Sequence, residues 1–377
     1  MSLKVCLAVK ALSFPWAGGH LWVYLNWALA LRSLGWDVVW MEAVSTTDQN
    51  IEEHFAALKA RLEPFGLADS IALYAKGSGR CLSSNYGAPV SVGEALRSDL
   101  LLNFGYDDVP AALVASFRRS ALVDIDPGQT QVWMSGNYLK LPQHDVYFTI
   151  GETVGSPGSR FPNCCIDWQY TPPPVFVPEW PVTPCAPSAP YTTVSNWWGN
   201  LFEFRGESFP NGKRDIFMKY VDLPSRVATP LELALCLYRN TNQDKEDRKL
   251  LQDNGWSVQE AWERVSTPHD YRTYVQQSRG EFSCVKPACI FLQNAWISDR
   301  TLCYLASGKP AIVQDTGPSH FLPKDSGLFR FQNIDEAARY LERASEDYEH
   351  HCRVARELAI EYFDAQKVVR RVLEVAM

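Results

Sequence analysis

Two short polar clusters flank one hydrophobic stretch in the last third of the sequence, AWISDRTLCYLASGKPAIVQDTG. Ser298 is a good helix N-cap and Asp299 suits a first helical turn, so a short apolar helix is expected to begin here. The free N–H groups at such a helix start can bind an anion, and Arg300 would add a bidentate donor. A well-capped helix with Arg300 on its surface is the structural alternative.

Asp315, Thr316 and Gly317 follow the next apolar run, which is expected to be a strand. Ligands of doubly wound sheets bind beyond the carboxyl ends of the strands. The helix start at Ser298 also follows such an end, so both clusters should lie on one rim. We therefore predict an anion site there, although Asp-Thr-Gly on its own also suits an ordinary turn.

Three further stretches could add positive charge to this rim. Arg279 precedes Gly280, which breaks a helical stretch, and it could bind a phosphate or pair with Glu281. Lys286 lies just beyond this segment and could also contribute positive charge. The alternative is that it is a surface residue. The segment 211–214, NGKR, is interpreted as a solvated loop, with added charge near a diphosphate as the alternative.

The first half of the chain holds candidate acid–base residues after its expected strands. Gly18 and Gly19 lie between the first strand and the first helix, where paired glycines let a backbone approach a ligand closely. His20 would lie at the helix start. Asp126 and Glu152 each follow an expected strand and could act as a base or hold a substrate hydroxyl. Turns and helix caps are the structural alternatives for these residues.

Motifs of several enzyme classes are absent from the sequence. There is no G-x-G-x-x-G fingerprint, although Glu42 ends the second expected strand, where a ribose-binding acid would lie. There is no Walker A loop, G-x-S-x-G elbow or H-E-x-x-H motif. Asp124 and Asp126 have D-x-D spacing, but Pro127 turns the chain after them. We predict neither a metal site nor a cofactor.

Length and composition indicate an ordinary globular protein with two domains. The chain has 377 residues, of which 46% are hydrophobic and 21% charged. A net charge of −7 without a Lys/Arg-rich block argues against a nucleic-acid partner. No signal peptide and no run of about 20 apolar residues is evident. The ten Cys show no zinc-like spacing, which favours reduced thiols and a cytoplasmic location.

Apolar runs alternate with helical patterns, which predicts parallel βαβ units. In the first half, strands are expected at 4–12, 37–44, 70–74, 100–104, 122–125 and 146–150. Thr171–Pro190 is rich in proline and is interpreted as a connector. After it, strands are expected at 192–194, 257–258, 288–292 and 327–331 and after Pro310, and helices at 215–223, 231–238, 270–282 and from 334 onward. The predicted fold is two Rossmann-like, doubly wound parallel-sheet domains that face a cleft.

These features together resemble glycosyltransferases of the GT-B fold, near family 4 and the "glycosyltransferase family 1" groups. The resemblance rests on Gly18–His20, Ser278–Ser283, Ser298–Arg300, Ala306–Pro310 and Asp315–Gly317. It implies an acceptor-side domain at 1–185, a nucleotide-sugar domain at 186–355, and a helix at 356–377 that crosses back to the first domain.

The resemblance also implies a function. This is metal-independent, hexosyltransferase-type transfer of a sugar from a nucleoside diphosphate sugar to a small-molecule, glycan or lipid-linked acceptor. The implied donor-binding residues are Gly18, Gly19, Arg279, Lys286, Ser298, Asp299, Arg300, Asp315, Thr316 and Gly317. His20, Asp126 or Glu152 would act on the acceptor hydroxyl.

The sequence departs from family 4 at one place. Many members carry two glutamates eight positions apart, and the matching positions here hold Ala295 and Cys303. Neither can hydrogen-bond a ribose as a carboxylate does, so Asp299 and Arg300 are expected to take over part of that role. A sugar-nucleotide epimerase and a non-catalytic nucleotide-sugar-binding protein are the alternative functions.

Overall fold

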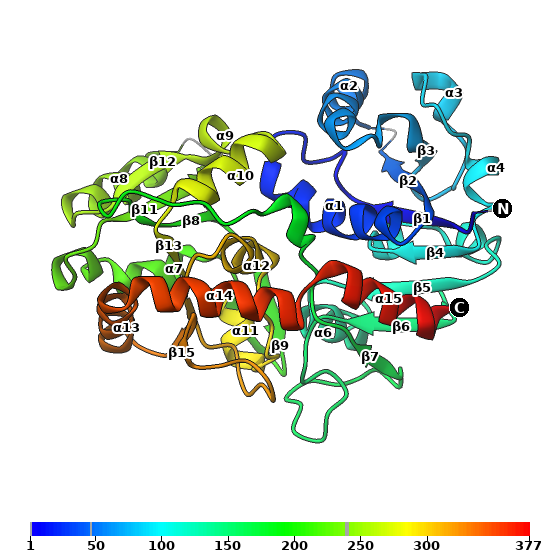
Figure 1. The fold of residues 1–377 in the computed structure, drawn as a ribbon. Coiled ribbons are helices and arrows are strands. Elements are labelled where there is room, and N and C mark those ends of the chain that lie inside the picture. The colour runs from blue at the N-terminus through cyan, green and yellow to red at the C-terminus, as the bar shows by residue number, and fades with distance from the viewer. Residues whose placement is uncertain (1, 46, 238–240) are drawn as a thin grey trace. The chain divides into compact units, whose positions relative to one another are not determined.

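The computed structural model describes residues 2–45, 47–237 and 241–377 (Figure 1). Contacts divide the chain into two compact units. Unit 1 comprises Met1–Phe176 and Ala365–Met377, and unit 2 comprises Val177–Asp364. The boundaries between the units therefore fall after Phe176 and Asp364. The boundaries expected from the sequence were after residues 185 and 355.

Unit 1 is built on a sheet of seven parallel strands in the order β3-β2-β1-β4-β5-β6-β7. Val5 of the interior strand β1 pairs with Val38 on one side and Leu100 on the other. Most strand residues are buried, as expected for a parallel sheet with both faces covered. The strands are β1 (Lys4–Val9), β2 (Asp37–Val44), β3 (Ile71–Ala75), β4 (Leu100–Asn103), β5 (Ser120–Asp124), β6 (Val146–Thr149) and β7 (Trp168–Tyr170).

The helices of unit 1 include the last one in the chain. They are α1 (Gly18–Ser33), α2 (Ile51–Leu62), α3 (Ser83–Tyr86), α4 (Val92–Ala95), α5 (Ala111–Val114), α6 (Gln129–Ser135) and α15 (Ala365–Ala376). Helix α15 packs against α1, and Gln366 donates a hydrogen bond to Ser33 Oγ at 3.0 Å. The backbone N–H of Ala365 bonds to the carbonyl of Val175 at 2.9 Å. The C-terminal helix is thus anchored in unit 1.

Unit 2 contains a second doubly wound sheet, in the order β12-β11-β8-β13-β14-β16-β15. Its strands are parallel except for the short edge strand β15. They are β8 (Tyr191–Asn196), β11 (Leu231–Cys236), β12 (Ser257–Glu260), β13 (Gly280–Ser283), β14 (Ala311–Gln314), β15 (Asp325–Ser326) and β16 (Leu328–Phe331). A separate antiparallel hairpin, β9 (Leu201–Phe204) and β10 (Glu207–Pro210), follows β8.

Three predicted elements of unit 2 were wrong in whole or in part. The helix expected at 270–282 ends at Gln277, and its last residues belong to strand β13. The segment expected to be a helix at 231–238 is strand β11, although Tyr238 itself lies outside the described residues. The segment expected to be a strand at 288–292 is helix α11 (Pro287–Leu292), which Pro287 can start because a first helical residue needs no N–H partner. Short apolar runs carry no periodicity that separates a buried strand from a buried helix.

The remaining helices of unit 2 alternate with its strands, as a doubly wound fold requires. They are α7 (Arg214–Phe217), α8 (Asn242–Asp253), α9 (Ala261–Arg264), α10 (Pro268–Gln277), α12 (Asp299–Ala306), α13 (Ile334–Glu346) and α14 (Tyr348–Tyr362). Aromatic side chains dominate the core of this unit, where the rings of Phe282 and Phe331 stack 5.4 Å apart. None of the helices in the described part of the chain is both long and apolar enough to cross a membrane. Two doubly wound parallel sheets confirm the predicted fold class.

Candidate functional site

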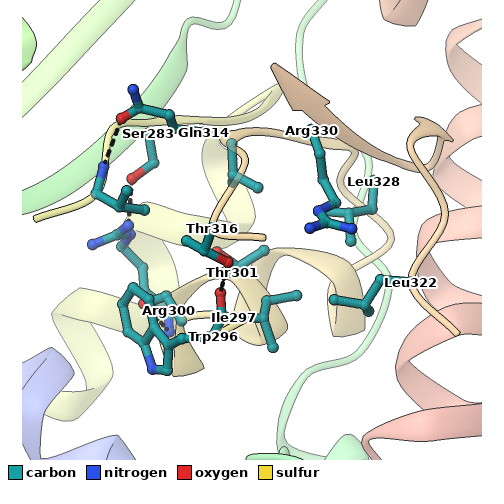
Figure 2. A pocket seen from close by; sticks show the side chains of 13 residues that line it. Ser283, Trp296, Ile297, Arg300, Thr301, Gln314, Thr316, Leu322, Leu328 and Arg330 are labelled. Atoms are coloured by element: carbon teal, nitrogen blue, oxygen red, sulfur yellow. Dashed lines mark hydrogen bonds between the residues drawn. The ribbon is translucent and has the colours of Figure 1, made fainter. Parts of the chain in front are cut away.

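A small pocket lies beyond the carboxyl ends of β13 and β14 in unit 2 (Figure 2). Its free volume is about 20 Å³, close to that of a single water molecule. Ser298, Arg300 and Thr316 are among the residues that line it, so the structure brings both predicted polar clusters to one place.

Two hydrogen bonds join Thr316 of the second cluster to the segment just before Ser298. The hydroxyl of Thr316 donates to the carbonyl of Trp296 at 2.6 Å, and the N–H of Ala295 donates to the carbonyl of Thr316 at 3.0 Å. At the start of α12, Ser298 Oγ accepts from the N–H of Arg300 at 3.3 Å, as the predicted N-cap should. Asp299 is the first residue of that helix.

Arg300 is occupied by protein groups. Its Nε lies 2.6 Å from Oε1 of Glu281, and one terminal nitrogen donates to the carbonyl of Val194 at 2.9 Å. The other terminal nitrogen donates to the hydroxyl of Ser283. The side chains of Arg300 and Glu281 are 12% and 0% exposed. The sequence suggested either that Arg300 lies on the surface or that it is free to bind a phosphate. The structure supports neither, because Arg300 is buried and paired with Glu281.

The Asp-Thr-Gly turn is also stabilised internally. Asp315 pairs with Arg330, and its Oδ1 accepts from the N–H of Gly317 at 3.0 Å. Gly317 has a φ of 124°, and a Cβ atom there would lie 2.8 Å from the carbonyl oxygen of Gln293. The turn therefore needs glycine at position 317. The Asp315 carboxylate is occupied by the N–H of Gly317 and by Arg330.

Lys213, which the sequence placed in a solvated loop, lies half-buried just before α7. It forms no ion pair or side-chain hydrogen bond with the residues that the structure describes. Burial lowers the pKa of its ammonium group to about 7, and the positive charges of Arg300 and Lys286 act in the same direction. Glu281 is the one carboxylate among the groups that influence it.

Two cysteines whose pKa values Lys213 influences indicate where Lys213 lies. Its charge acts on Cys236, at the carboxyl end of β11, and on Cys284, just after β13. Lys213, Lys286 and Arg300 therefore share the carboxyl edge of this sheet with Glu281, which pairs with Arg300. Glu260 also acts on Cys236, but it pairs with Arg248. Such an excess of positive charge favours an anionic ligand. We call these three side chains the cation cluster.

Arg279 is separated from the cation cluster. It directly precedes β13, so it lies at the amino end of the strand whose carboxyl end leads to Lys286. Its guanidinium stacks over the ring of Tyr348 at 4.0 Å, and Tyr348 donates a hydrogen bond to its carbonyl at 2.6 Å. The predicted grouping of Arg279 with the donor-binding residues is therefore not supported by its position.

In unit 1, the predicted Gly18 and Gly19 are the first two residues of α1, and His20 is the third. Ala17 makes no side-chain cap there. Nε2 of His20 lies 2.9 Å from the carbonyl oxygen of Lys10. A carbonyl oxygen only accepts, so Nε2 carries the proton and Nδ1 keeps its lone pair. Burial lowers the pKa of His20, which keeps the ring neutral at pH 7.

The negative charge of Asp126 raises the pKa of the His20 ring, against the larger effect of burial. Asp126 follows β5, whose last residue, Asp124, is a buried carboxylate. Asp124 accepts hydrogen bonds from Thr130 at 2.7 Å and Gln131 at 2.8 Å, which stabilises the loop after β5. His20 and Asp126 thus interact electrostatically within unit 1.

Glu152 and Glu42 have different surroundings. Glu152 follows β6, and its charge adds to the effect of burial in raising the pKa of Tyr170 on β7. Glu42 is 1% exposed and accepts from the N–H of Leu12 at 3.1 Å and from Trp40 Nε1 at 2.8 Å. Glu42 therefore fixes the loop after β1 and is not presented to a ribose. No group of three or more His, Cys, Asp or Glu suited to a metal ion occurs among the described residues.

No protein-family model and no curated protein sequence matches the chain. Solved structures do resemble it. An alpha-glucosyltransferase in complex with UDP is 11% identical over 100% of both chains, with a TM-score of 0.62. An alpha-glucosyltransferase in complex with UDP-glucose and DNA is 11% identical over 100% of both chains, with a TM-score of 0.60. A glycosyltransferase from Rickettsia africae is 12% identical over 100% of this chain and 98% of its own, with a TM-score of 0.56. The chain thus has the fold of GT-B glycosyltransferases, as the sequence resemblance predicted.

Proposed function

We propose that the protein transfers a sugar from a nucleoside diphosphate sugar to a hydroxyl group of an acceptor. The observation that carries the proposal is the cation cluster of Lys213, Lys286 and Arg300 at the carboxyl edge of the unit 2 sheet. This edge is where doubly wound sheets bind their ligands. The structural resemblance to enzymes solved with UDP and UDP-glucose supports a nucleoside diphosphate as the anion.

The cation cluster would act on the leaving group. As the bond between the anomeric carbon and the diphosphate oxygen breaks, negative charge grows on the diphosphate. Lys213 and Lys286 would stabilise that charge, and fixed cations do so without reorganisation during the reaction. Arg300 would contribute mainly by neutralising Glu281, which would otherwise repel the diphosphate. These lysines supply the positive charge that a metal ion provides elsewhere, so we propose a reaction without a metal or a cofactor.

His20 and Asp126 would act on the acceptor. With Nε2 donating to Lys10, the lone pair of Nδ1 can take the proton of an acceptor hydroxyl as its oxygen bonds to the sugar. The negative charge of Asp126 would stabilise the imidazolium that results. Gly18 and Gly19 would offer backbone N–H groups at the start of α1. Glu152 is the second candidate for the base.

The resemblance to a putative UDP-N-acetylglucosamine 2-epimerase from Listeria monocytogenes favours one other function. That structure is 10% identical over 99% of this chain and 95% of its own, with a TM-score of 0.51. An epimerase needs acid and base groups near the sugar but no acceptor. Incubation with nucleotide sugar alone, followed by NMR, separates the two: a changed sugar configuration without an acceptor indicates the epimerase.

A panel of nucleotides tests the proposal. UDP, GDP, ADP and TDP, each with a corresponding sugar conjugate, are added separately, and the melting temperature is measured. A ligand that binds only the folded state raises this temperature by mass action. We expect one nucleoside diphosphate to raise it clearly more than inorganic phosphate does. Equal melting temperatures across the whole panel would contradict the proposal.

A further inference from the structure

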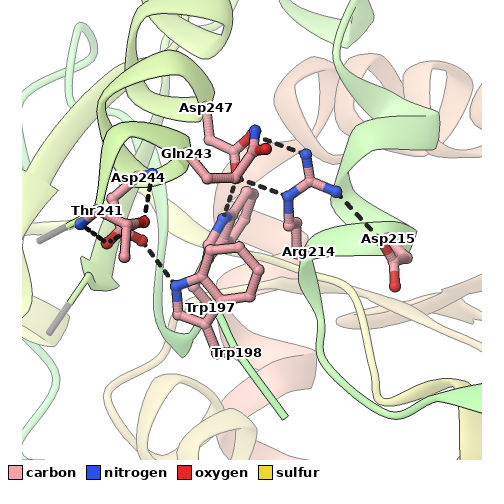
Figure 3. Close-up of polar contacts among 8 residues, drawn as sticks. All are labelled: Trp197, Trp198, Arg214, Asp215, Thr241, Gln243, Asp244 and Asp247. Atoms are coloured by element: carbon pink, nitrogen blue, oxygen red, sulfur yellow. Dashed lines mark hydrogen bonds and ion pairs between the residues drawn. The ribbon is translucent and has the colours of Figure 1, made fainter. Parts of the chain in front are cut away.

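Asp247, on helix α8, lies at the centre of a hydrogen-bonded cluster that includes Arg214, the residue after Lys213 (Figure 3). Its side chain is 2% exposed. Oδ2 accepts from Trp197 Nε1 at 2.8 Å and from Arg214 Nε at 2.6 Å. Oδ1 accepts from a terminal nitrogen of Arg214 at 2.8 Å and from Gln243 at 2.9 Å. Both oxygens are thus fully used, and Arg214 is held by two parallel bonds.

Arg214 is the residue that follows Lys213. It lies just after the β9–β10 hairpin and is hydrogen-bonded to Trp197, which lies just before it. Its backbone N–H donates to the carbonyl of Trp197 at 3.1 Å, while its side chain and that of Trp197 meet at Asp247. The segment before β9 and the segment after β10 are therefore held together at the base of the hairpin.

Two glycines allow this close approach. A Cβ atom on Gly199 would lie 2.6 Å from the carbonyl carbon of Asn211, and one on Gly212 would lie 2.9 Å from the backbone nitrogen of Gly199. Asn211 also accepts from the N–H of Ala288 in α11 at 3.1 Å, which ties the loop to the helix that Lys286 precedes. The backbone on either side of Lys213 is thus fixed from α8 and from α11.

We infer that Asp247 is a positioning residue, which through Arg214 and Trp197 holds Lys213 at the carboxyl edge of the sheet beside Lys286. The inference rests on the proposed function, because it assigns Asp247 to the diphosphate site of that proposal. Asp247 itself does not contact the ligand. Because Asp247 pairs with the guanidinium of Arg214, that charge is neutralised. The unpaired ammonium of Lys213 then remains to bind the diphosphate.

The charge state of Lys213 reports its position. The ionisable groups that influence it are Arg300, Lys286, Glu281 and Cys289, and its charge in turn acts on Cys236 and Cys284. As long as Lys213 is held among them, its ammonium group loses its proton near pH 7. A Lys213 released into water would stay charged to a much higher pH. Loss of position therefore changes the pH profile of ligand binding, which a purely structural weakening does not.

The test is calorimetric titration with UDP from pH 6.5 to 8.5. Asp247→Asn removes the carboxylate charge at nearly constant shape, and Trp197→Phe removes one donor. Glu179→Gln is the control, because it likewise removes a carboxylate charge that pairs with an arginine, Arg272, in the same unit. We expect Asp247→Asn to weaken UDP binding roughly tenfold at pH 6.5 and to flatten the pH profile, as hydrogen bonds to charged groups have this magnitude. Trp197→Phe should change both in the same direction, and Glu179→Gln neither.

The outcomes separate the inference from the proposed function. A folded Asp247→Asn variant with unchanged affinity and an unchanged pH profile overturns the inference. If Asp247→Asn does not fold, Trp197→Phe decides by the same two readouts. If the unaltered protein binds none of UDP, GDP, ADP and TDP, the proposed function itself is wrong, and the inference fails with it.

Discussion

Arg300 and Glu281 form an ion pair inside unit 2, with Nε 2.6 Å from Oε1 and the carboxylate fully buried. Removing one partner of such a pair leaves the other buried and uncompensated. We therefore predict that Arg300→Ala lowers the free energy of unfolding by about 3–5 kcal/mol. Denaturant titration of both proteins measures this. A variant of unchanged stability that has lost only nucleotide affinity would instead show Arg300 to be a direct ligand.

The pH dependence of nucleotide binding should report Lys213. Its pKa lies below the ordinary lysine value, at about 7, in the free protein, and a bound diphosphate favours the charged form. Affinity should therefore be highest below pH 7 and fall as the pH rises through 7, approaching about tenfold per pH unit. Measurements from pH 7 to 8.5 avoid the phosphate ionisation near pH 6.

Lys213→Arg provides the control for this pH dependence. The guanidinium does not lose its proton in this range, so the decline in affinity should disappear in that variant. A decline of the same size in Lys213→Arg would assign it to another group.

Replacement of His20 should affect catalysis and not donor binding. If Nδ1 accepts the proton of the acceptor hydroxyl, His20→Ala should lower kcat by about 10²- to 10⁴-fold, the range that general-base catalysis contributes. The rise in melting temperature with the nucleoside diphosphate should stay as in the unaltered protein. Full activity in His20→Ala would leave Glu152 as the candidate base, to be tested in Glu152→Gln.

Glu42 should make the stability of unit 1 depend on pH. Burial raises its pKa from the ordinary value of 4.5 to about 7 in the folded protein, even though Trp40, Ala11 and Leu12 donate to the carboxylate. Between these values the folded state holds a proton that the unfolded state has lost. The stabilising contribution is thus present below pH 4.5 and is lost as the pH rises to 7, on the order of 3 kcal/mol.

Urea denaturation of Glu42→Gln at several values between pH 5 and 7.5 tests the role of Glu42. The glutamine cannot ionise, so the decline attributed to Glu42 should be absent from the variant. Parallel curves for the two proteins would mean that Glu42 is ionised throughout.

The fold could be predicted from the sequence because its signal is repeated. Strands such as Asp37–Val44 and helices such as α1 carry clear apolar patterns, and their alternation predicts a doubly wound sheet. The errors fall on short apolar runs. Leu231–Cys236 and Pro287–Leu292 are six residues each, too few for periodicity to separate strand from helix.

The candidate site was harder to predict, because its charges are set by partners that are distant in the sequence. Arg300 binds Glu281, and that contact depends on β13, which the sequence suggested was part of a helix. Lys213 looked like a loop residue, because nothing near it in the sequence shows that Asn211 and Arg214 are anchored to α11 and α8. The Asn-Gly-Lys-Arg stretch after a hairpin was the one available signal.

Calorimetric titration of Lys213→Ala with the nucleoside diphosphate that stabilises the protein most tests the cation cluster directly. Lys219→Ala is the control, since Lys219 is exposed in the same unit. The proposed site predicts that Lys213→Ala loses about 1.5–3 kcal/mol of binding free energy, the usual size for a hydrogen bond to a charged group. Lys219→Ala should bind as the unaltered protein does. Equal affinity in the unaltered protein and in Lys213→Ala, both folded, would contradict a diphosphate site at this edge of the sheet.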